Sequence, residues 1–113
     1  MKRVVLTIVA VFFAAPLLLA QDAAKVAAGK KAYETQKCAT CHQVAGQGNK
    51  MAPLDGVGKK LTEADIKKWL TDPAAMEAKL PKKPVASMAG YLKTHKLTDA
   101  DVDGLVAYLM TLK

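Results

Sequence analysis

The sequence predicts a small all-α domain, and three observations support this prediction. Apolar residues recur at helical spacing in several segments, whereas the alternation of apolar and polar residues that is typical of strands is absent. Two of these segments begin with the same helix-capping pattern. The chain has only 113 residues, which is enough for one small domain. We therefore expect helices joined by loops around one core.

Residues 1–20 have the pattern of a secretory signal peptide. They begin with two basic residues and continue as an uncharged apolar run. This run contains Pro16, is shorter than the roughly 20 apolar residues that a spanning helix needs, and is followed by polar residues. We therefore favour cleavage near Ala20 over a retained anchor. The predicted organisation is an exported chain with a signal peptide at 1–20, one domain at 21–113 and no membrane span after cleavage.

The first predicted helix of the domain covers residues 23–35. Val26, Gly29 and Tyr33 lie on one face at helical spacing. Because a glycine carries no side chain, Gly29 would let another helix approach closely. The stretch 43–60 follows, and its four glycines and one proline are too closely spaced for a regular element. We expect a long loop there, and loops of this length usually surround a functional site.

Two later helices are predicted to begin with a capping box combined with a hydrophobic staple. In the first, Thr62 caps the helix together with Asp65, while Leu61 and Ile66 occupy the staple positions. The last helix repeats this pattern with Thr98, Asp101, Leu97 and Val102. Its buried side is predicted to consist of Leu105, Tyr108, Leu109 and Leu112.

The segment between these two helix starts is predicted to be mostly irregular. The first capped helix has an apolar face that consists of Ile66, Trp69 and Leu70. It should end near Asp72, because Pro73 disfavours helical geometry in the residue before it. Asp72 can then cap a short helical turn. The stretch 81–96 contains two prolines and one glycine, which predicts an extended loop that ends near Tyr91.

The charge and the aromatic content limit the partners. The formal net charge is +7, and nearly all basic residues are lysines. This balance suits a protein partner with an acidic face, because charge steering speeds the encounter. Nucleic acid would also attract such a chain. However, no arginine remains after cleavage, and the four remaining aromatic residues are too few to stack bases: Tyr33, Trp69, Tyr91 and Tyr108. We therefore predict redox proteins and no nucleic acid as partners.

The stretch QKCATCHQVAG, residues 36–46, holds both cysteines and one of the two histidines. A disulfide between Cys38 and Cys41 is possible in an exported chain, but it would give no role to the adjacent His42. A thioredoxin-like thiol pair expects a βαβ setting, which the sequence does not show. A zinc site would need His95 as a fourth ligand, and the neighbours Cys41 and His42 would struggle to reach one tetrahedral centre.

Covalent attachment of a c-type haem uses all three residues at once, and C-x-x-C-H is its signature. Each thiol can form a thioether to one vinyl-derived carbon of the porphyrin edge. His42 then projects its imidazole toward the iron as the proximal ligand. We therefore predict one haem c attached through Cys38 and Cys41. A haem would also help to stabilise a domain of below about 100 residues, whose own apolar core supplies little surplus stability.

With this motif the chain resembles the small class I bacterial cytochromes c, over nearly all of its mature length. GKKAYETQKCATCH resembles the first helix and haem motif of that family, and LVAYL resembles its terminal helix. The resemblance implies that these two helices cross around the haem. APLDGVG resembles the loop whose proline carbonyl holds the proximal histidine, which implies that role for Pro53 and a haem contact for Leu54. WLTDP resembles the helix whose tryptophan lies by a haem propionate, which points to Trp69.

The sixth iron ligand has five candidates, namely Met51, Met76, Met88, Met110 and His95. Met51 follows His42 closely, in a loop that is needed to turn around the proximal side. Met76 and Met110 lie in helical segments, where methionine is usually a filling residue. His95 is expected to be a solvated histidine near a helix start.

Met88 is the predicted sixth ligand. It lies in the proline-containing stretch before the last helix, and KKPVASMAGY resembles the ligand loop of the family. Ala89 stands where the family often has proline. The resemblance implies His42 and Met88 as the two axial ligands of the iron.

The predicted function is one-electron transfer between redox partners in the periplasm, without transformation of a substrate. Seven lysines flank the haem-wrapping segments, and they either form a docking surface for an acidic redox partner or keep the protein soluble: Lys37, Lys50, Lys59, Lys60, Lys79, Lys82 and Lys83. Two alternatives remain open. One is a haem-bearing subunit of a larger oxidoreductase, and the other is a haem-based gas sensor in which a gas displaces Met88.

Overall fold

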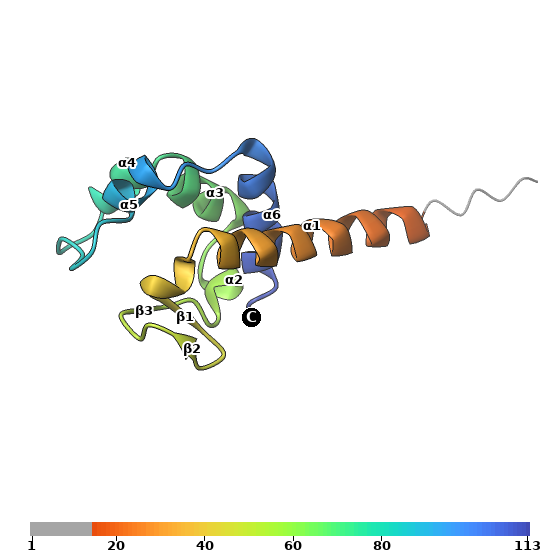
Figure 1. Cartoon of the computed structure of the whole chain (residues 1–113), viewed down its shortest axis with the longest axis horizontal. Coiled ribbons are helices and arrows are strands. Elements are labelled where there is room, and N and C mark those ends of the chain that lie inside the picture. Colours follow the sequence, from red (N-terminus) through yellow and green to blue (C-terminus); the bar gives the residue numbers. More distant parts are fainter. Residues whose placement is uncertain (1–14) are drawn as a thin grey trace, which may run out of the picture.

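The computed structural model describes residues 15–113, which form a mostly helical domain (Figure 1). Its helices are α1 (Ala15–Thr35), α2 (Val57–Lys60), α3 (Glu63–Thr71), α4 (Pro73–Glu77), α5 (Met88–Thr94) and α6 (Asp99–Met110). Most of the predicted signal peptide 1–20 lies outside the described residues. The backbone of α1 continues without a break past Ala20, where cleavage is predicted. Within residues 15–113, no helix combines the length and the apolar character that crossing a membrane requires.

Helices α1 and α6 cross at two glycines (Figure 1). A Cβ atom at Gly29 would overlap the carbonyl oxygen of Gly104, and a Cβ at Gly104 would lie 2.8 Å from the backbone nitrogen of Gly29. Next to this contact, the rings of Tyr33 and Tyr108 meet edge to face, with centroids 5.8 Å apart. The predicted crossing of the first and last helices is therefore confirmed.

Helix α6 is the centre of the core, because it packs against α1 and α3 together. Facing α3, Val102, Val106 and Leu109 are buried with Ile66. Facing α1, Leu105 is buried with Ala32 and Tyr33. The predicted buried side of the last helix was too narrow, because it omitted Val106. It also included Tyr108, which is only half-buried, and Leu112, which is half-buried and lies beyond the end of α6 at Met110. One stripe cannot describe a helix that has a partner on two sides.

The predicted helix caps are all present. The hydroxyl of Thr62 accepts a hydrogen bond from the backbone N–H of Asp65, and that of Thr98 accepts one from the N–H of Asp101, both at 3.1 Å. In each case the aspartate carboxylate accepts the N–H of the capping threonine in return, which completes a capping box. Asp72 ends α3 and caps α4, with its Oδ1 accepting from the N–H of Ala75 at 3.3 Å.

A small sheet that the sequence did not predict follows the cysteine motif. It contains β1 (His42–Val44), β2 (Gln47–Gly48) and β3 (Ala52–Pro53), in the order β2-β1-β3. Strands β1 and β2 are antiparallel, whereas β1 and β3 are parallel, with His42 opposite Ala52. Strands of two or three residues are too short to show an alternating pattern in the sequence.

The predicted extended loop over 81–96 is wrong in its second half. The chain is irregular through Ala86, but α5 begins at Met88. Ser87 caps this helix, because its Oγ accepts a hydrogen bond from the N–H of Gly90 at 3.1 Å. The irregular segment thus ends at Ser87 and not near Tyr91. Helix α5 is only two turns long, and its sequence pattern is therefore weak. The prolines before it led to the prediction of a loop.

Candidate functional site

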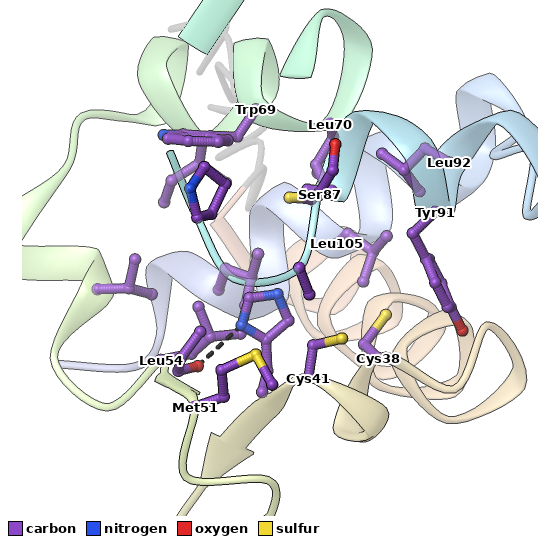
Figure 2. A pocket seen from close by; sticks show the side chains of 18 of the residues that line it. Cys38, Cys41, Met51, Leu54, Trp69, Leu70, Ser87, Tyr91, Leu92 and Leu105 are labelled. Carbon is purple, nitrogen blue, oxygen red and sulfur yellow. Dashed lines mark hydrogen bonds between the residues drawn. The ribbon is translucent and has the colours of Figure 1, made fainter. Parts of the chain in front are cut away.

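An apolar cavity of about 540 Å³ lies between the cysteine motif, α1, α3, α5 and α6 (Figure 2). Its volume falls within the range of roughly 300–1,000 Å³ that is typical of small-molecule and cofactor sites. Six of the seven residues predicted to hold a haem line this cavity, and they are Cys38, Cys41, His42, Leu54, Trp69 and Met88. Pro53 is the exception.

Both cysteines line the cavity, and one short 3₁₀ turn, η1 (Cys38–Thr40), positions them: Cys38 begins this turn and Cys41 is its C-cap. Lys37 precedes this turn in the left-handed conformation, with φ of 53°, and the backbone N–H of Cys41 donates a hydrogen bond to the carbonyl of Cys38 at 3.1 Å. Both side chains are free thiols and half-buried. Figure 2 shows their sulfur atoms on the same side of the cavity. The spacing in the sequence thus brings both thiols to one cavity wall.

Burial makes Cys38 a poor nucleophile in this arrangement. Desolvation raises the pKa of its thiol to about 11, so the sulfur stays protonated at neutral pH. Thiol pairs that exchange disulfides have lowered pKa values instead. The surroundings of Cys38 therefore argue against the interpretation as a redox-active dithiol.

The imidazole of His42 is oriented by a backbone carbonyl. Its Nδ1 lies 2.8 Å from the carbonyl oxygen of Ala52, as the dashed line in Figure 2 marks. A carbonyl only accepts hydrogen bonds, so Nδ1 carries the proton and donates it. The proton-free Nε2 therefore keeps its lone pair for a metal. A second hydrogen bond of this kind is typical of histidines that bind metal ions.

This contact corrects the predicted role of Pro53 by one residue. The resemblance assigned the carbonyl that holds His42 to Pro53, but the acceptor is Ala52. The reason is the parallel pairing of β1 with β3, which puts Ala52 opposite His42 and Pro53 opposite Gln43. Pro53 is exposed and does not line the cavity.

The remaining predicted contacts come from other elements. Trp69 and Leu70 of α3 lie across the cavity from the two cysteines (Figure 2). Leu54 packs against both core clusters and also lines the cavity. The structure thus brings Leu54 and Trp69 to the same cavity as the cysteine motif, and their contact with haem stays a prediction.

Of the five candidates for a sixth ligand, Met51 and Met88 line the cavity. Met51 is 49% exposed and lies on the side of Cys41 in Figure 2. Met88 begins α5, directly after Ser87, which lies across the cavity from Cys41. Met76, Met110 and His95 do not line it.

Sequence reasoning missed Tyr91 as a link between α5 and the cysteine motif. Its hydroxyl donates a hydrogen bond to the carbonyl of Gln36 at 2.7 Å, at the end of α1. The ring also stacks on the imidazole of His95, with centroids 3.9 Å apart and the planes parallel within 1°. His95 is therefore half-buried against Tyr91, whereas the sequence predicted a solvated histidine. No local pattern signals a contact between residues so distant in the sequence.

A haem fits the residues that form this cavity. They offer two free thiols on one turn, an imidazole with a proton-free Nε2, a thioether and apolar walls. The hydroxyl of Tyr33 also lies in the cavity wall and is buried without a partner among residues 15–113, as expected where a bound group or an ordered water completes a site. In the same part of the chain, no three or more histidine, cysteine and acidic side chains are grouped so that they could hold a metal ion.

Comparison with known protein families identifies a match. The sequence profile of the cytochrome c family matches residues 26–113, which covers every element from most of α1 to the end of the chain. Neither the curated proteins nor the solved structures contain a significant match to this sequence.

Proposed function

Because this chain belongs to the cytochrome c family, whose members carry electrons by means of haem, we propose that it transfers single electrons between periplasmic redox proteins with His42 and Met88 as the iron ligands. Cys38 and Cys41 attach the haem covalently. Members of this family are typically electron carriers and not enzymes. The attached haem supplies an iron that changes its oxidation state by one electron.

The observation that carries the ligand assignment is the hydrogen bond between His42 and Ala52. It fixes the direction of the imidazole and leaves Nε2 available to bind a metal. A methionine thioether at the other axial position favours ferrous over ferric iron. The cavity is lined mostly by apolar side chains, so a haem held there would be partly shielded from water and less solvent would have to reorganise when the charge of the iron changes.

Export to the periplasm is proposed from the N-terminal pattern, and the exposed surface suits an acidic redox partner. Val85 is 93% exposed in the segment that borders the cavity. Three exposed lysines precede it in the sequence, namely Lys79, Lys82 and Lys83. An exposed apolar residue close in the sequence to positive charges can pack against a partner that the charges have oriented.

Replacing Met88 by alanine is expected to abolish the weak far-red charge-transfer band of the oxidised protein. This band reports sulfur bound to low-spin ferric haem. The substitution should also lower the reduction potential and allow the reduced protein to bind carbon monoxide, since the sixth position becomes vacant. The measurements are visible spectra with and without carbon monoxide and a redox titration.

Met51→Ala and Met76→Ala are the matched controls and should keep the band. If Met51→Ala abolishes it while Met88→Ala does not, the ligand assignment passes to Met51 and the electron-carrier function stands. A wild type that lacks the band and binds carbon monoxide readily would favour the gas sensor.

Electron transfer with an acidic redox protein should slow as salt rises, because charges separated by more than about 8 Å are screened at physiological ionic strength. Lys82→Glu combined with Lys83→Glu should slow the reaction at low salt and flatten its salt dependence. Lys25→Glu combined with Lys30→Glu changes the net charge by the same amount on exposed residues of α1 that do not line the cavity, and is the control. Stopped-flow rates measure the effect. If the charge-reversal variant near the cavity and the control variant in α1 react at equal rates, the lysines near the cavity serve solubility and not docking.

A further inference from the structure

The carboxylate of Glu77 bonds to the residues on both sides of Met88. Glu77 is the last residue of α4, and its side chain also borders the cavity. Its Oε1 accepts a hydrogen bond from the backbone N–H of Ala89 at 2.9 Å. The hydroxyl of Ser87 donates to the same carboxylate, at 3.0 Å from Oε2 and 3.2 Å from Oε1. One acidic side chain thus bridges α4 to the start of α5.

We propose that Glu77 is a positioning residue for Met88, whose thioether it keeps directed at the cavity by fixing Ser87 and Ala89. This inference rests on the proposed role of Met88 as an axial ligand. Glu77 would not touch the iron. It would act by holding the backbone on each side of the ligand, so that the sixth position is preorganised.

The need for such a clamp follows from the place of Met88 in its helix. Met88 is the first residue of α5, and the first N–H groups of a helix find no acceptor within it. Ser87 Oγ accepts the N–H of Gly90 at 3.1 Å, and Glu77 accepts that of Ala89. The two acceptors are themselves joined, because Ser87 donates to Glu77. Together they hold the first turn of α5 against α4.

The segment before Met88 offers little other restraint. Residues 79–87 are all exposed, and Val85 is 93% exposed. After Met88, the hydroxyl of Tyr91 anchors the next turn to the carbonyl of Gln36. The position of Met88 therefore depends on one anchor on each side, Glu77 before it and Tyr91 behind it. Hydrogen bonds to an ionised carboxylate are roughly twice as strong as neutral ones, so Glu77 is the stronger type of anchor.

The test compares the strength of the Met88–iron bond with the stability of the whole domain. Glu77→Ala in the haem-loaded protein should raise the affinity of ferric haem for added imidazole by about tenfold, the effect of losing one strong hydrogen bond. The far-red band should also disappear at a lower temperature than in the wild type. The midpoint of global unfolding, followed by far-UV circular dichroism, should move less than the midpoint of the band.

Three further variants locate the effect. Glu63→Ala removes an equal charge from the first turn of α3 and should leave imidazole affinity within about twofold. Glu77→Gln keeps an acceptor oxygen and should recover part of the wild-type behaviour. Ala89→Pro removes the N–H that Glu77 accepts while a helix tolerates proline in its first turn. In that background, Glu77→Ala should have a smaller effect on imidazole affinity than in the wild type.

The outcomes separate this inference from the proposed function. If Met88→Ala removes the far-red band but Glu77→Ala changes neither imidazole affinity nor the band midpoint, the clamp is refuted and the ligand assignment stands. If Glu77→Ala lowers the band and the global midpoint equally, its role is only structural and the inference is again overturned. If Met88→Ala keeps the band, the ligand assignment itself fails.

Discussion

Replacing Cys38 and Cys41 together by alanine is expected to give a chain that carries no covalent haem and has little stable helix. Emptying a cavity costs about 24 cal/mol per Å³ of residual volume, so the 540 Å³ cavity would cost at most about 13 kcal/mol. The total stability of a native domain is about 5–15 kcal/mol. Because this upper limit is similar to the total stability, we expect the helices that surround the cavity to lose their arrangement without the haem.

This result can be checked in two independent measurements. The haem spectrum after denaturation in pyridine reports covalent attachment, and far-UV circular dichroism reports helix content. Thr40→Ser is the control, because it changes the same turn and leaves both thiols in place. A double alanine variant that is haem-free and yet well folded would contradict the idea that the haem replaces part of the core.

Gly29→Ala is expected to destabilise the domain by about 3 kcal/mol or more, which is the upper end for overpacked sites. The new Cβ would overlap the Gly104 carbonyl and lie 2.8 Å from the Cβ of Tyr108. Neither atom can turn away, since one belongs to the backbone of α6 and the other is fixed to it. For a domain of this size the loss corresponds to a fall in Tm of more than about 10 °C.

Thermal unfolding of the haem-loaded protein measures this effect. Gly90→Ala is the matched control, because its Cβ would make only ordinary contacts, at 3.6 Å from Ser87. Alanine also favours a helix more than glycine does, so the control should be neutral or slightly stabilised. An unchanged Tm for Gly29→Ala would mean that α1 and α6 do not approach each other at these glycines.

Local interactions account for most of what the sequence could predict. The capping boxes at Thr62 and Thr98 involve residues three positions apart, so their pattern can be read directly, and both are present. The haem motif is equally local. The crossing of α1 with α6 is a long-range contact, but Gly29 and the resemblance to a known family together indicated it.

Contacts between distant segments account for the errors. The carbonyl that orients His42 belongs to Ala52, because β1 pairs with β3. Strands of two or three residues are too short for the sequence to indicate such a pairing. The hydrogen bond from Tyr91 to Gln36 spans 55 positions, and no periodic pattern marks its two ends. The hydrogen bond that Glu77 accepts from Ala89 was missed for the same reason. In each case the sequence shows which side chain can form a hydrogen bond, but it does not show which residue is its partner.

The crossing of α1 and α6 also decides when the polypeptide can fold during its synthesis. Helix α1 and the two thiols leave the ribosome early, whereas α6 comes last among the described elements. Until α6 exists, α1 lacks the surface that buries Ala32 and Tyr33, and an isolated helix is only marginally stable in water. Joining the two helices then closes nearly the whole domain into one loop. We therefore expect Cys38 and Cys41 to stay accessible to haem attachment until α6 packs against α1.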